Sequence, residues 1–198
     1  MSQTTRISDH DYFVNNGGLQ LDWLEPPQLS ADDWSALRSH LPYRVDDELK
    51  TYGFAQCEIT VDIGGPAVYL ERCLFGGFNF NFGKKDSVLL ADNTPDKLSI
   101  HLLFNPPVQA IGSQVSATGP LDVEYLGLLA VRLESTGEWE HWSGRGVLNR
   151  IPGSAPFIGA AAKPGERITE VWFDVVDANN ANGVNFIHVA INDLYFLT

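Results

Sequence analysis

The segment from Gly137 to Arg145 holds the residue types of a sugar-binding site. Two tryptophans, Trp139 and Trp142, flank Glu140, and an arginine ends the segment. Sugars present apolar C–H faces and hydroxyl edges, so a site for them needs an aromatic platform beside carboxylate, amide or guanidinium groups. We therefore select Trp139, Glu140, Trp142 and Arg145 as candidate ligand-binding residues.

Strand alternation divides this segment between two faces. Trp139 and His141 fall on one face of a strand, and Glu140 with Trp142 on the other, so one tryptophan is expected in the core. The alternative is that both tryptophans are buried, one of them beneath a helix.

An Asn-rich run follows further along the chain and could supply polar ligands. Its candidate ligand-binding residues are Asp177, Asn179, Asn180 and Asn182. An EF-hand loop starting at the aspartate would need an oxygen ligand at position 181, glycine at 182 and an acid at 188. The sequence has Ala181, Asn182 and His188 there, so the EF-hand is excluded. The run instead predicts a hairpin turn whose residues tolerate left-handed backbone angles.

The closing strand predicts a β-bulge. Its apolar residues keep a period of two up to Ile191, but Leu194 is offset from it by three, which places the bulge at Asn192-Asp193. Because a bulge redirects side chains, Asp193 is a candidate ligand for a structural calcium ion. The alternative is a carboxylate bonded to backbone N–H groups.

Spaced blocks of β-branched and aromatic residues, separated by Pro, Gly, Asn and Asp, predict antiparallel strands joined by turns. The predicted strands are 54–63, 67–74, 76–82, 98–105, 108–117, 121–134, 138–143, 155–161, 168–176 and 184–197. One helix is predicted over 31–41, with Ser30 as N-cap, an acidic first turn and Pro42 after its end. We expect an all-β, antiparallel, jelly-roll-like β-sandwich with this one short N-terminal helix as a cover, in a single domain over 1–198.

Charge and hydropathy exclude several classes of partner. The chain has 13 Lys+Arg against 25 Asp+Glu, a formal net charge of -12. Such a surface repels phosphate backbones, so we expect no nucleic acid partner. The sequence has no run of 18 apolar residues, so no membrane span is predicted. The first residues do not form a signal peptide, so we expect either a protein that is cytoplasmic as encoded or one whose leader is missing from the given sequence. Cys57 and Cys73 are expected as free thiols, and a disulfide between them would indicate export.

Enzyme signatures are missing from the sequence. It contains no G-x-S-x-G, H-E-x-x-H, P-loop or G-x-G-x-x-G motif, and its five histidines are scattered. His101 and His188 lie within predicted strands and could share a face, but histidines with structural hydrogen bonds are more common than metal pairs. We therefore predict a protein that is not an enzyme.

The second half resembles a bacterial β-sandwich domain of extracellular proteins, including those with a PEP-CTERM sorting tail, which is similar in layout to jelly-roll carbohydrate-binding modules. The motifs that carry the resemblance are Phe104-Asn105-Pro106-Pro107-Val108, Phe157-Ile158-Gly159 and Ile191-Asn192-Asp193-Leu194-Tyr195-Phe196. The resemblance implies a sandwich fold and an extracellular location. Asn192 replaces the first acid of the family's closing motif, which argues against a metal there. The chain as given also ends at Thr198 without a sorting tail.

Three functions remain open from the sequence. The first is a non-catalytic, lectin-like, carbohydrate-binding module with a glycan partner and a structural calcium ion. The second is a structural or protein-interaction module that docks a partner or a second copy as a homo-oligomer. The third is a glycan-processing enzyme. An exposed Trp142 beside Arg145 in a groove would favour sugar binding, and an apolar patch around Trp34 would favour assembly.

Overall fold

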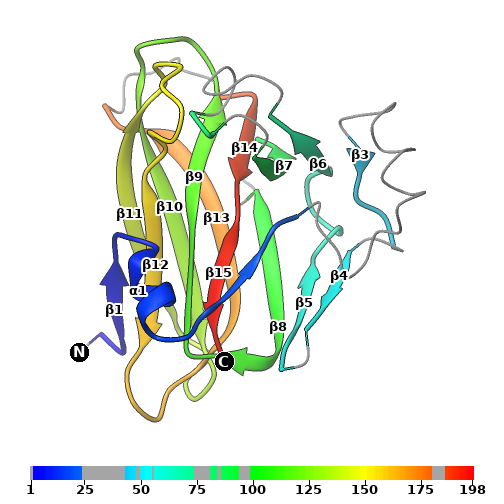
Figure 1. Ribbon diagram of the computed structural model, residues 1–198, viewed down its shortest axis with the longest axis vertical. Helices are drawn as coiled ribbons and strands as arrows, with labels where there is room; N and C mark the ends of the chain where they lie inside the picture. The colour runs from blue at the N-terminus through cyan, green and yellow to red at the C-terminus, as the bar shows by residue number, and fades with distance from the viewer. Residues whose placement is uncertain are drawn as a thin grey trace.

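Two antiparallel sheets pack face to face and form the body of the protein (Figure 1). The computed structural model describes residues 2–23, 43–47, 50–54, 56–73, 81–83, 86–93, 99–179 and 186–198. The predicted helix 31–41, including Trp34, lies outside these residues. The predicted fold class, an all-β antiparallel sandwich with one short helix, is confirmed.

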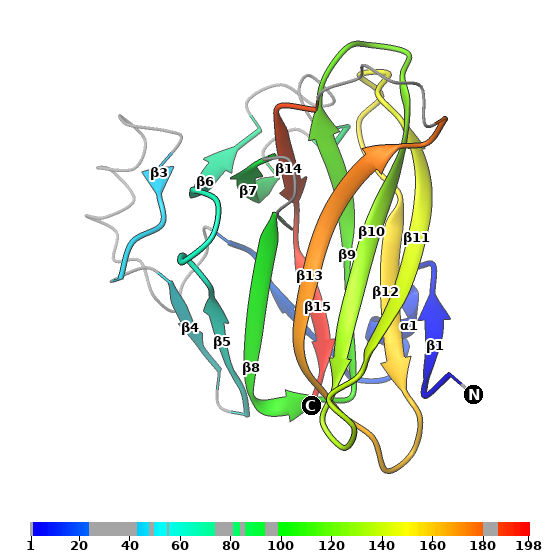
Figure 2. The ribbon, with the colours of Figure 1, turned by 180° about the vertical axis from the view of Figure 1, so that it is seen from behind.

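The first sheet has six strands in the order β11-β10-β13-β8-β5-β4. Their bounds are β4 Thr51–Gly53, β5 Glu58–Val61, β8 Ile100–Val108, β10 Glu124–Leu133, β11 Trp139–Val147 and β13 Ile168–Asp177. Figure 2 is seen from the side of this sheet, with β8, β13, β10 and β11 next to one another in front. Its apolar residues alternate: Ile100 and Leu102 are buried, whereas Leu103 is exposed.

The second sheet has nine strands, and its main path runs β1-β12-β9-β14-β7-β6-β3, with β15 pairing with both β9 and β2. Their bounds are β1 Thr4–Ile7, β2 Leu19–Leu21, β3 Tyr43–Arg44, β6 Val68–Arg72, β7 Ser87–Asp92, β9 Ala110–Thr118, β12 Phe157–Ala162, β14 His188–Ile191 and β15 Leu194–Leu197. The sequence did not predict β7. Residues 87–91 are all buried, so the strand has no polar face and no alternation to detect.

The predicted bulge at Asn192-Asp193 is confirmed by the strand register. Ile191 pairs with Val115 of β9, and Tyr195 pairs with Gly112. The three residues 192–194 therefore lie opposite only two residues, 113 and 114, so the closing segment contains one extra residue.

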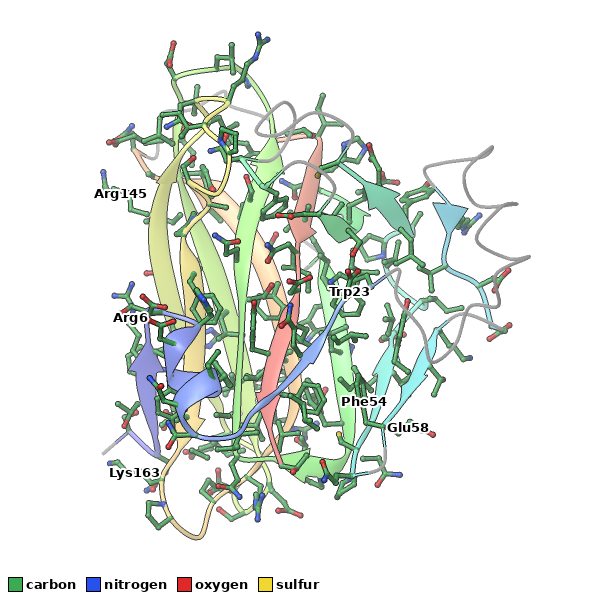
Figure 3. All side chains as sticks on the ribbon, in the orientation of Figure 1. Arg6, Trp23, Phe54, Glu58, Arg145 and Lys163 are labelled. Carbon is green, nitrogen blue, oxygen red and sulfur yellow. The ribbon has the colours of Figure 1, made fainter. Side chains whose placement is uncertain are left out.

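Aromatic contacts join the two sheets across the core. The ring of Trp23, which follows β2, contacts Tyr52 of β4 with centroids 5.5 Å apart. Phe54, after β4, contacts Phe196 of β15 at 5.1 Å; Trp23 and Phe54 are labelled in Figure 3. Both are edge-to-face contacts, which the ring quadrupoles favour.

The one described helix, α1 (Asp11–Asn15), lies against the nine-stranded sheet. Its Phe13 is buried and contacts Phe157 and Tyr195 with ring centroids about 6 Å apart. The sequence did not predict this helix, whose single turn is too short to show an apolar periodicity.

Both cysteines are free thiols, as predicted. Among the described residues, no helix has the length and apolar character that crossing a membrane requires.

Candidate functional site

A groove of about 510 Å³ lies on the outer face of the six-stranded sheet. Its strand residues are Trp139 and His141 of β11, Ala130 of β10 and Trp172 of β13, and the turn Gly64–Pro66 after β5 completes it. Two tryptophans that are distant in sequence therefore line one depression.

Strand alternation and register bring these side chains together. Val171 and Phe173 are fully buried, so Trp172 between them points to the outer face. Ala130 pairs with Trp172 on one side and with His141 on the other. Because alanine is small, the position between the two larger side chains leaves room for a ligand.

The indole of Trp172 stacks on His101 of β8. The two ring centroids are 3.9 Å apart and the ring planes differ by 5°. One face of the indole is thus covered, and the opposite face is the one that can contact a ligand in the groove.

Charged side chains hold His101 from both sides. Its Nδ1 lies 2.9 Å from Oδ2 of Asp62, and its Nε2 lies 2.8 Å from Oε2 of Glu170. The other oxygen of Glu170 accepts a hydrogen bond from Nη1 of Arg132 at 2.5 Å. The stacked pair therefore rests on a network that spans β10, β13, β8 and the end of β5.

Both carboxylates of this network are held ionised. The N–H of Gly64 donates to Asp62 at 2.8 Å, and this bond, followed by that with His101, lowers the pKa of Asp62. Burial alone would raise the pKa of Glu170, but the bonds from Arg132 and His101 outweigh it and the pKa is lowered.

Of the residues selected from the sequence, Trp139 lies in the groove, with 37% of its surface exposed. Trp142 lies on the opposite face, as alternation predicts, and packs against the core. Its Nε1 donates to Oγ1 of Thr4 at 2.9 Å.

Glu140 ties the first strand to β11. Its carboxylate accepts hydrogen bonds from the Ser2 hydroxyl at 2.7 Å and from the Thr4 N–H at 2.9 Å, with further bonds from the Gln3 N–H and the Thr4 hydroxyl. The structure thus gives Glu140 a role in anchoring β1, away from the groove face.

Arg145 lies toward the far end of β11 from Trp139 (Figure 3), about 20 Å away at the usual rise per residue. It pairs with Glu124 at 2.8 Å. Asp177 lies at this same end of the sheet, and its Oδ1 accepts from the N–H of Asn179 at 2.9 Å. Asn180 and Asn182 lie outside the described residues. The predicted site is therefore dispersed: Trp139 lies in the groove, Glu140 and Trp142 lie on the opposite face, and Arg145 and Asp177 lie at the far end of the sheet.

Asp193, the predicted calcium ligand, accepts a hydrogen bond from Nε2 of Gln20 at 2.6 Å. In the described part of the chain, Asp9, His10 and Asp11 form the one group of potential metal ligands, with their ligand atoms within 4.8 Å of one another. All three are exposed, and Asp193 is not among them. A calcium ion at Asp193 stays a prediction.

Sequence reasoning missed Trp172 and Asp62, and it considered His101 only as a possible metal partner of His188. Alternation nevertheless carried a signal for Trp172 and His101. Trp172 interrupts the buried series Val171 and Phe173, and His101 does the same between Ile100 and Leu102. His188, by contrast, lies in the nine-stranded sheet, so the idea that it shares a face with His101 is wrong.

We expect the hydrogen bonds between Glu140 and β1 to make the free energy of unfolding depend on pH in the acid range. Burial opposes ionisation of this carboxyl, but its bonds from Thr4, Gln3 and Ser2 outweigh burial and lower its pKa. The stabilisation from the ionised Glu140 is complete at pH values above the ordinary carboxyl pKa, and it is lost as the pH falls through the lowered pKa of the folded protein. Glu140→Gln should reduce the free energy of unfolding by about 1–2 kcal/mol at pH 7, and by less at pH 3. Urea denaturation at both pH values measures this.

Glu138→Gln is the matched control for the Glu140 anchor, because Glu138 is exposed just before the same strand. Equal effects of the two substitutions at pH 7 would contradict the anchoring role.

Comparison with known proteins carries no argument about this chain. No family model matches the chain, and no curated protein matches it. A solved structure that is similar is the N-terminal endo-1,4-β-D-xylanase 10B of Clostridium thermocellum, its CBM22-1 and GH10 modules in complex with xylohexaose. The identity is 9%, the match covers 66% of this chain and 24% of that chain, and the TM-score is 0.35. Similarity this weak carries no argument about function, and the sequence resemblance to PEP-CTERM-sorted proteins gains no support. The chain is an antiparallel β-sandwich.

Proposed function

We propose that this protein binds a neutral glycan chain in the groove between Trp139 and Trp172 and does not cleave it. The observation that carries the proposal is that two tryptophans from different strands line one groove on the outer face of a sheet, with the small Ala130 between their strands. Indole faces match the apolar C–H faces of sugar rings, and a groove accommodates a chain better than a flat surface does.

Polar groups at the groove supply partners for hydroxyl groups. His141 lines it, and the turn Gly64–Pro66 brings backbone groups to its edge. The net charge of -12 disfavours acidic polysaccharides through long-range repulsion. These features support a neutral glycan as the ligand.

The ionisation of the nearby carboxylates supports binding without hydrolysis. A glycosidase needs one carboxylic acid that stays protonated until it donates to the leaving group. Asp62 and Glu170 both have lowered pKa values. Burial raises the pKa of Asp174 on β13. Asp174 does not line the groove, however, and its Oδ1 accepts a hydrogen bond from Ser99.

A polysaccharide panel tests the proposal. Affinity electrophoresis against soluble xylan, mixed-linkage β-glucan, mannan and polygalacturonate should show retardation by at least one neutral polymer and none by the acidic one. Release of reducing ends over a day should stay at the level of a protein-free control. Runs with calcium and with EDTA test the predicted ion at Asp193, and binding in the groove should survive EDTA. Absence of retardation by every neutral polymer would refute the proposal.

A further inference from the structure

We propose that His101 is a positioning residue, which fixes the indole of Trp172 in the orientation that a glycan meets. This inference rests on the proposed function and adds a residue that does not itself line the groove. Trp172 lines the groove, and His101 lies on its covered face.

Hydrogen bonds at both ring nitrogens determine the plane of His101. Rotation about either side-chain torsion would break the 2.9 Å contact to Asp62, the 2.8 Å contact to Glu170, or both. The imidazole side chain is only 11% exposed, so water cannot readily replace those partners. A ring held at two points therefore offers one surface to its neighbour.

The two carboxylates that contact the ring are themselves held in place. Glu170 is oriented in turn by Arg132, and Asp62 by the N–H of Gly64. Both carboxylates that contact the ring nitrogens are thus themselves tied, Asp62 to the backbone and Glu170 to a second side chain.

The fixed imidazole transmits its orientation to Trp172 by stacking. The 3.9 Å centroid distance and the 5° angle between planes give an extended contact, which any tilt of the indole would reduce. A platform ordered before binding avoids the entropy cost of ordering it on binding. Loss of His101 should therefore weaken glycan binding although no ligand contact is removed.

His188 provides a matched control within the same chain. It is also a strand histidine with polar partners, Thr118 at 3.0 Å and Asp92 at 3.6 Å, but its side chain is 34% exposed and it lies in the nine-stranded sheet. Substitution there removes an equivalent side chain without touching Trp172.

The first measurement is affinity for the best oligosaccharide of the panel by titration calorimetry. His101→Ala should weaken binding roughly three- to tenfold, the range expected when one large side chain must be ordered on binding. Asp62→Asn, at a more exposed site, should weaken it by about twofold and serves as the test if His101→Ala does not fold. His188→Ala should leave affinity unchanged.

The second measurement needs no ligand. The chain has five tryptophans, and the indole N–H signal of Trp172 in a ¹H–¹⁵N spectrum is the one lost in Trp172→Phe. His101→Ala and Asp62→Asn should shift or broaden this signal, and His188→Ala should not.

These readouts separate the two proposals. A wild-type protein that binds no glycan refutes the proposed function, and the indole signal then still decides whether His101 orders Trp172. A wild-type protein that binds, with affinity and indole signal unchanged in both His101→Ala and Asp62→Asn, overturns the positioning role.

Discussion

Replacement of both groove tryptophans, Trp139→Ala with Trp172→Ala, is expected to abolish measurable glycan binding. An aromatic anchor at the centre of an interface commonly contributes 2 kcal/mol or more, so each single substitution should weaken binding by about 30-fold or more. Both side chains are partly exposed and neither belongs to the buried core. The melting temperature should therefore change little, and calorimetric titration with a parallel thermal melt measures both quantities.

Arg145→Ala is the matched control for the tryptophan substitutions. Arg145 is exposed on the same strand as Trp139 but about 20 Å further along it, outside the groove. Its substitution should leave affinity within twofold of wild type. Loss of binding in Arg145→Ala, with binding retained in both tryptophan variants, would place the ligand at the other end of the sheet, beside Asp177.

A second variant of the groove tests its shape rather than its aromatic groups. Ala130→Leu places a larger side chain between Trp172 and His141, so it should block the ligand while both tryptophans remain. Affinity unchanged in Ala130→Leu would show that the ligand does not enter the space between the two strands.

The largest effect on stability is expected from Gly146→Ala in β11. A Cβ atom at this position would lie 2.4 Å from Cζ of Tyr125. Tyr125 is fully buried, and its hydroxyl donates to the carbonyl of Val115 at 3.0 Å, so the ring cannot move aside without losing that bond. Overpacking of this kind costs about 1–3 kcal/mol, and a lost buried bond adds to it. The expected fall in melting temperature is roughly 2–4 °C for each kcal/mol.

Gly53→Ala is the corresponding control, because Gly53 lies in β4, at the other edge of the same sheet. A Cβ atom there has no neighbour within 4 Å. Its substitution should leave the free energy of unfolding nearly unchanged or slightly increased, since alanine reduces the freedom of the unfolded chain. Equal urea midpoints for Gly146→Ala and Gly53→Ala would contradict the contact with Tyr125.

The fold class and the faces of individual strands follow from local sequence. Alternation separates Trp139 from Trp142, and the three-residue offset before Leu194 locates the bulge, because both depend only on neighbours along one strand. The fully buried β7 has no such pattern and was missed for that reason.

The groove itself depends on which strands become neighbours and in which register. Trp139, Ala130 and Trp172 meet because β10 pairs with both β11 and β13. Asp62 reaches His101 because β5, which Asp62 follows, pairs with β8 in the same sheet. Proximity in sequence misled the prediction of one site from Trp139 to Arg145, since a strand of that length carries its two ends about 20 Å apart. Local alternation is thus enough to predict the sandwich and the two faces of a strand such as β11. The side chains that share a site come from residues far apart in the chain, so the pairing and register of the strands are needed to identify them.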